Sequence, residues 1–323
     1  MNENKSLLSG GLDMVRHNKR YIVWFYVLNV FLGLFGTVAF VNQAGTILDH
    51  SLHADRLLHG LDLGALIEMF VQPEYGPTIV SRLPAVCFAL LFLFATALFL
   101  PGVLQGYAST YRLPRDEFFR ACGRNLWRFI RLMIVAGIVM IPLTTALFSL
   151  HGVLEKKAAE STNELLLPEV RLAGLVVIFL VMAAVRIWFD LAQVDIVMSD
   201  QRVVRRSIGL SFRHTWRNLG RLLGSYVMTT VVALIILVAG VWAWSRFVPP
   251  ASVRGAFLVS QLTLLLLLIP RFWQRGVVVT YYLQNMVEPI AVVPFTPAPV
   301  EVPVMNEPVA APVMPSPPAE QAL

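Results

Sequence analysis

The chain has 323 residues, of which 57% are hydrophobic and only 14% are charged, and its mean hydropathy is +0.67. Soluble domains carry about 25% charged residues, so this composition excludes a soluble globular protein and indicates a membrane protein. The basic residues that give the chain its formal net charge of +6 lie beside apolar stretches. Their position predicts the orientation of the chain in a membrane and does not indicate a nucleic-acid partner. The two cysteines, Cys87 and Cys122, fall in different compartments of the expected topology, so no disulfide framework is predicted.

Six apolar stretches are long enough to cross a hydrocarbon core that needs about 20 residues. The first exceeds the apolar run of a signal peptide, so we expect an uncleaved span. Together they predict an all-α polytopic bundle over residues 1–288. The predicted spans are 21–42, 82–105, 129–150, 171–191, 222–247 and 254–275.

Lysine and arginine mark one side of this predicted membrane domain. Four of them precede the first span, and six lie in each of the segments that lead into the third and fifth spans. The loops on the other side mix basic residues with acidic ones. Because loops rich in Lys and Arg stay in the cytoplasm, we expect both termini to be cytoplasmic.

A recurring motif indicates an internal repeat. The residues around Asn125 recur around Asn218, and residues 11–26 fit the same register more weakly through Asn18. In the returning spans, Arg186-Ile187-Trp188 occupies the place of Arg271-Phe272-Trp273. The pattern predicts three hairpins, each preceded on the cytoplasmic side by an amphipathic basic helix, which we call a lead helix. The matched pairs are Phe119/Phe212, Arg120/Arg213, Arg124/Arg217, Leu126/Leu219 and Arg128/Arg221.

The second and third lead helices separate arginines from apolar residues. At about 100° per residue, arginines spaced four apart form a stripe opposite apolar positions, which include Phe118, Phe119 and Cys122 in the second lead helix and Phe212 in the third. Such helices lie at the membrane interface and attract anionic head groups. The stripe has two interpretations: it orients the chain, or it forms a specific site for lipid phosphate. The candidate lipid-binding residues are Arg120, Arg124, Arg128, Arg213, Arg217 and Arg221.

Charged residues near the inner ends of two spans form a second candidate site. Arg186 and Asp190 lie one helical turn apart, and intramembrane charges often mark functional sites. The alternative is structural, because an i, i+4 ion pair satisfies itself and long side chains reach the interface. Arg271 and Arg275 occupy the matching place in the sixth span, where we expect them at the interface without an acidic partner. An interfacial aromatic belt is expected from Trp127, Trp188, Trp216 and Trp273.

The segments outside the spans carry three further features. The first loop contains His50, His53 and His59 beside aspartates. On the helix expected over 48–70 these zinc-type ligands face different ways, so no metal site is predicted. The second loop, 155–160, is expected to be a short charged helix or a solvated loop. Proline-rich residues 289–323 predict a disordered cytoplasmic tail, with a docking peptide for a cytoplasmic protein as the alternative.

The run from Ser207 to Arg221 resembles a signature of the membrane domain attached to some bacterial glycerophosphodiester phosphodiesterases, and of related uncharacterised polytopic inner-membrane proteins. The resemblance implies a helical protein of the bacterial inner membrane with an envelope- or lipid-associated role. The catalytic domain of those enzymes has no counterpart in these residues, so no hydrolase activity is implied. The matching residues are Ser207, Ser211, Phe212, Arg213, Thr215, Asn218 and Arg221.

No catalytic or cofactor-binding motif occurs in the sequence, which favours a protein without enzymatic activity. We therefore expect a lipid-contacting or envelope-associated membrane scaffold whose partners are anionic membrane lipids. The alternative is a transporter or channel for a lipid-like or weakly charged solute, because a charged cargo would require ionisable residues near mid-span. A membrane enzyme is the third possibility, and it would need Arg186 and Asp190, or the histidines of the first loop, to converge on one pocket.

Overall fold

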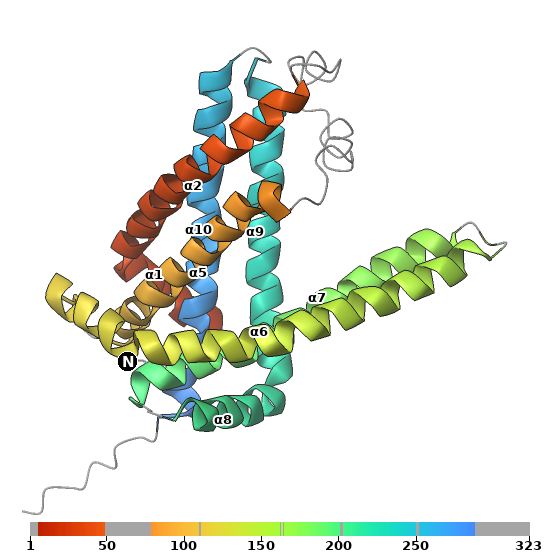
Figure 1. The fold of residues 1–323 in the computed structure, drawn as a ribbon. Helices are drawn as coiled ribbons and strands as arrows, with labels where there is room; N and C mark the ends of the chain where they lie inside the picture. The colour runs from red at the N-terminus through yellow and green to blue at the C-terminus, as the bar shows by residue number, and fades with distance from the viewer. Residues whose placement is uncertain are drawn as a thin grey trace, which may run out of the picture. The chain divides into compact units, whose positions relative to one another are not determined.

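The computed structural model (Figure 1) describes residues 6–48, 79–109, 111–161, 163, 165–200, 203–249 and 252–287. Within these ranges the protein has eight helices and no strands, which confirms the all-α prediction. The expected helix after residue 48, the histidines of the first loop and the proline-rich tail lie outside the described residues. The helices are α1 (Leu7–His17), α2 (Lys19–Leu48), α5 (Ile79–Ala108), α6 (Arg115–Ala159), α7 (Leu166–Met198), α8 (Val204–Arg217), α9 (Leu219–Phe247) and α10 (Val253–Asn285).

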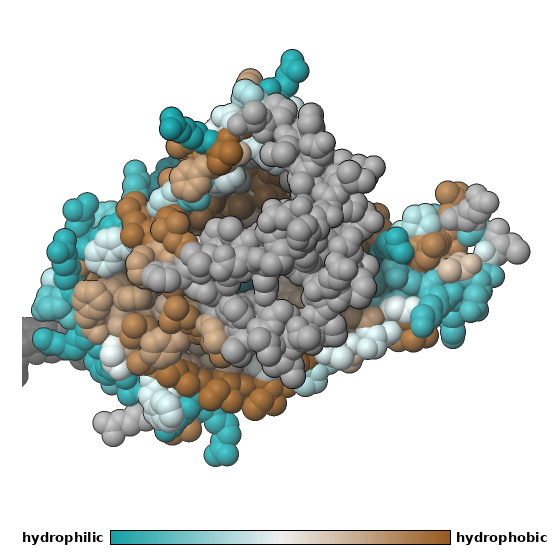
Figure 2. Space-filling model, turned by 45° about the horizontal axis from the view of Figure 1, so that its top comes forward, coloured by the Kyte–Doolittle hydropathy of each residue, from teal (hydrophilic) through white to brown (hydrophobic). Residues whose placement is uncertain are grey.

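Five stretches of the described chain are long and apolar enough to cross a membrane. They are α6, α7, α9, α10 and the Leu90–Ala108 part of α5. The predicted first span lies in α2, whose side chains are described only as far as Leu34. Hydrophobic side chains are exposed on the face drawn in Figure 2, as expected where lipid is the solvent. The charged segment 155–160 is not a separate element, because α6 continues without a break through Ala159.

Consecutive long helices pair as hairpins, α2 with α5, α6 with α7 and α9 with α10. Each lead helix in turn packs on a returning helix: α1 on α10, the first part of α6 on α5, and α8 on α7. The α1–α10 contact joins the two ends of the described chain, and in Figure 1 α1 lies against the lower part of α10. The lead helices are therefore integral parts of the bundle.

Two of these helix pairs are joined by the same hydrogen bond. The indole Nε1 of Trp273 donates to the backbone oxygen of Leu8, and that of Trp188 donates to the backbone oxygen of Ile208, both at 2.8 Å. Leu8 lies ten residues before Asn18 and Ile208 ten residues before Asn218. Asn18 and Asn218 are the residues that cap the C-terminal ends of α1 and α8, so the two contacts have the same register.

Glycine allows α1 and α10 to touch backbone to backbone. A Cβ atom on Gly11 would lie 2.7 Å from the backbone nitrogen of Val277, and one on Gly276 would lie 2.5 Å from the backbone oxygen of Gly11. Ordinary van der Waals contacts of a Cβ begin at about 3.4 Å. Any side chain at these positions would push the helices apart.

The second lead helix is held by aromatic packing instead. The buried ring of Phe118 stacks on Tyr21 at 5.5 Å between centroids and meets Trp24 edge-on at 5.4 Å. A Cβ on Gly102 of α5 would lie 2.6 Å from the Phe118 ring and 2.7 Å from Cys122 Sγ. Here α6 runs straight through Asn125, whose Nδ2 donates to the backbone oxygen of Ala121 at 3.1 Å, so lead helix and span form one continuous helix.

Candidate lipid interface and buried charge cluster

The face of α8 that contacts the bundle carries small polar residues. Ser207, Ser211 and Thr215 are buried, at most 3% exposed. Small side chains spaced four apart let two helices approach closely. Their hydroxyl oxygens have no hydrogen-bond partner within the part of the chain that the structure describes. Asn218 at the end of α8 donates through Nδ2 to the Tyr281 hydroxyl at 2.7 Å, which ties this end of α8 to α10.

The opposite face of α8 presents arginines beside aromatic rings. Arg213 and Arg217 are exposed, and so is Arg221 at the start of α9. Phe212 is 49% exposed and Trp216 68%, with their rings stacked at 6.0 Å between centroids. None of these three arginines forms an ion pair with another described residue. An unpaired cation next to an exposed indole suits the boundary between head groups and acyl chains, where both find partners.

The first part of α6 repeats this combination. Arg120 and Arg124 are exposed and form no ion pair within the described ranges. Phe119 is 55% exposed and Trp127 60%. Sequence reasoning placed Phe119 and Phe212 together with the buried apolar positions. In the structure Phe118 and Cys122 face the protein, whereas Phe119 and Phe212 point outward on the side of the arginines.

Arg128 differs from the other arginines of the predicted stripe. Its side chain is only 15% exposed, and its Nη1 pairs with Asp200 Oδ1 at 2.5 Å. The same nitrogen donates to Asn125 Oδ1 at 3.2 Å. Arg128 therefore links α6 to the segment that follows α7, and it does not belong to the set of exposed arginines without an ion pair.

α8 also carries an imidazole side chain, that of His214. Partial burial lowers the pKa of its imidazole below the ordinary value, and the charges of Arg213 and Arg217 lower it further. Asp195 acts weakly in the opposite direction. The neutral imidazole is thus the form that fits the folded helix.

A second constellation lies inside the bundle, centred on Asp190 of α7. Its Oδ2 accepts a hydrogen bond from the buried Tyr226 hydroxyl at 2.8 Å and lies 3.6 Å from Arg186 Nε. Its Oδ1 lies 3.9 Å from Nη1 of Arg275, which also donates to Gln193 Oε1 at 3.2 Å. One carboxylate therefore serves two guanidinium groups from two helices.

The expectation that Arg275 has no acidic partner is therefore wrong. Arg275 and Asp190 lie 85 positions apart in the sequence, and only the packing of α10 on α7 brings them together. Sequence reasoning also assigned Trp188 and Trp273 to an aromatic belt and missed their hydrogen bonds to the lead helices. Trp127 and Trp216, in contrast, are largely exposed.

The described residues hold no group of three or more His, Cys, Asp or Glu side chains arranged to bind a metal ion. The histidines of the first loop lie outside these described residues. No family model, no curated protein and no solved structure matches this chain. The resemblance to phosphodiesterase-associated membrane domains therefore stays a prediction from the sequence.

Proposed function

We propose that this chain is a non-enzymatic protein of the bacterial inner membrane that holds anionic lipid on the cytoplasmic leaflet through its lead helices. The observation that carries the proposal is the outward-facing set of unpaired arginines, each beside an exposed aromatic ring, on α6 and α8. A cation near an anionic bilayer surface contributes about 1 kcal/mol. Four such arginines would bind lipid head groups firmly enough for some to remain through purification.

We further propose six spans in three hairpin repeats, with both termini in the cytoplasm. The matched hydrogen bonds of Trp188 and Trp273 support the repeat, because they join residues that the sequence alignment pairs independently. The positions of Lys and Arg support the orientation. A scaffold role follows from the same geometry, since lead helices fixed to the bundle hold their basic faces in constant positions relative to the spans.

Native mass spectrometry of protein released from its own membrane tests the function. The variant Arg120/Arg124/Arg213/Arg217→Gln removes the unpaired surface, and Arg246/Arg254→Gln is the matched control because these exposed arginines lie at the other end of α9 and α10. We expect the wild type and the control to retain anionic lipid that the fourfold variant loses. Equal lipid retention by all three would show that the stripe only sets orientation.

A further inference from the structure

The sixth span carries more positive charge than its surroundings neutralise. Arg271 lies one helical turn before Arg275 on α10, and no described acidic side chain pairs with Arg271. Its guanidinium lies 5.6 Å from the centre of the Phe92 ring. Arg186 and Arg275 already share the single carboxylate of Asp190, so Arg271 adds a third guanidinium group without a second carboxylate to pair with it. Within a membrane such an excess is costly unless an anion joins the cluster.

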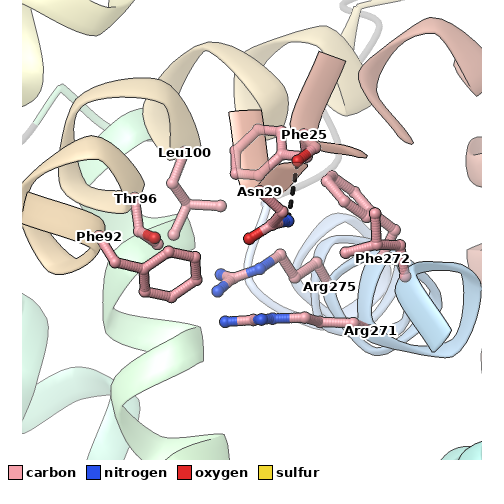
Figure 3. Close-up of a pocket in the computed structure, with 9 residues that line it drawn as sticks. Phe25, Asn29, Phe92, Thr96, Leu100, Arg271, Phe272 and Arg275 are labelled. Atoms are coloured by element: carbon pink, nitrogen blue, oxygen red, sulfur yellow. Dashed lines mark hydrogen bonds between the residues drawn. The ribbon is translucent and has the colours of Figure 1, made fainter. Parts of the chain in front are cut away.

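The two arginines open into a pocket between three helices. Figure 3 shows both guanidinium groups extending from α10 toward Phe92 and Thr96 of α5, with Asn29 of α2 beside Arg275. The pocket has a volume of about 20 Å³, which is room for about one water molecule or one oxygen of a larger anion. Arg275 is half-buried, with 13% of its side chain exposed, while Arg271 is exposed.

We propose that Arg271 and Arg275 bind the phosphate group of an anionic phospholipid at the mouth of this pocket, between α2, α5 and α10. Arginine suits this role because its planar fork binds phosphate oxygens in pairs. One phosphate oxygen enters between the two guanidinium groups and relieves their mutual repulsion. This site lies between three helices of the bundle and shares no residue with the exposed arginines of α6 and α8, so the proposal does not depend on those arginines retaining lipid.

The two arginines recognise a phosphate group, and their surroundings favour a lipid head group over a free phosphate ion. The pocket is too small to enclose a free phosphate ion, so most of the group must remain outside. α2 and α5, two of the three helices that line the pocket, expose the apolar side chains Leu34, Leu90 and Phe94 elsewhere on their surfaces, which acyl chains would cover. The hydrogen bond of Trp273, two residues from Arg271, to Leu8 puts the site at the level of the lead helices. Basic pockets between spans at that level bind anionic head groups in other membrane proteins.

The test is thermal unfolding of delipidated full-length protein in neutral detergent, titrated with phosphatidylglycerol, phosphatidylcholine or inorganic phosphate. A ligand that binds only the folded state raises the unfolding midpoint. We expect phosphatidylglycerol to raise the midpoint and the other two additions to leave it unchanged. For Arg271→Gln, the phosphatidylglycerol concentration for half-maximal stabilisation should rise about tenfold.

Arg271→Gln should leave the lipid-free midpoint equal or higher, because it removes a cation that repels Arg275 and has no acidic partner. Arg254→Gln at the other end of α10 is the matched control and should titrate like the wild type. Arg271→Lys keeps the positive charge but lacks the planar guanidinium group, so its half-maximal phosphatidylglycerol concentration should lie between those of the wild type and Arg271→Gln. It serves as the test if Arg271→Gln fails to fold. The variant Arg120/Arg124/Arg213/Arg217→Gln should still show the rise of the unfolding midpoint at the same phosphatidylglycerol concentration as the wild type. That result would separate this site from the proposed interface on α6 and α8.

Two results would overturn the proposal. If Arg271→Gln and Arg271→Lys titrate like the wild type, the pocket holds no lipid phosphate. If inorganic phosphate raises the wild-type midpoint as much as phosphatidylglycerol does at equal concentration, the occupant is a soluble anion and the assignment to lipid is wrong.

Discussion

Replacing Gly11 with alanine tests the close crossing of α1 and α10, on which the position of the first lead helix depends. The added Cβ would lie 2.7 Å from the backbone nitrogen of Val277 and 3.0 Å from the backbone carbonyl carbon of Gly276. Both are backbone atoms of a helix, so neither can rotate away. The helices must move apart by several tenths of an ångström, and the contacts around the Trp273–Leu8 hydrogen bond loosen with them.

Two opposing effects decide the sign of the change. Overpacking a well-packed contact costs about 1–3 kcal/mol, and a clash with backbone belongs in the upper part of that range. Alanine in place of glycine inside a helix gains about 0.5–1 kcal/mol. The free energy of unfolding should therefore fall by about 1–2 kcal/mol. In detergent this lowers the midpoint of thermal unfolding by a few degrees.

Gly209→Ala is the matched control for Gly11→Ala. Gly209 lies inside α8, and a Cβ there would meet no heavy atom within 4 Å. The control should raise the midpoint, because only the gain in helix propensity of about 0.5–1 kcal/mol remains. If Gly11→Ala stabilises the protein as much as Gly209→Ala does, then α1 does not pack on α10 at this distance.

Three further substitutions test the polar contacts. Asp190→Asn should lower the free energy of unfolding by about 3 kcal/mol because the arginines around it lose their counter-charge, and an unchanged midpoint in detergent would contradict this. Trp273→Phe removes a hydrogen bond worth about 1 kcal/mol, so trypsin should cut α1 at Arg16 faster than in the wild type; an equal cutting rate would show that the bond does not hold α1. His214 has a lowered pKa in the fold, so its contribution to stability is complete above the ordinary value of about 6.5 and is lost as pH falls below it. His214→Gln should therefore flatten the decline in midpoint between pH 7 and 5, and parallel declines in variant and wild type would refute the assignment.

The sequence was sufficient to predict the features that depend on local composition. Long apolar runs predict helices wherever the described chain has them, and the alignment pairs Asn18 with Asn218, each of which lies between two helices in the structure. The break itself was not predictable, because Asn125 occupies the corresponding place in an uninterrupted helix. The difference comes from partners far along the chain: Asn218 donates to Tyr281, whereas Asn125 donates to its own helix at Ala121.

Contacts between distant helices were the part that local patterns could not supply. The charged residue nearest to Asp190 in the sequence is Arg186, so the sequence suggested a self-contained pair. The approach of Arg275 depends on how α10 packs on α7. The exposure of Phe119 and Phe212 has the same origin. An aromatic residue on an amphipathic helix can face protein or lipid, and only the packing of the lead helices on α5 and α7 decides which.

Photo-crosslinking in living cells tests most directly whether the lead helices lie on anionic lipid. A photoreactive amino acid replaces Phe119, Phe212 or, as the control, Leu234, which is exposed on the apolar surface of α9. Lipid adducts are then identified by mass spectrometry. Adducts at 119 and 212 should be enriched in anionic head groups over those at 234, which should follow the average composition of the membrane. The same head-group composition at all three positions would contradict the proposed interface, as would adducts at 119 and 212 that consist of protein.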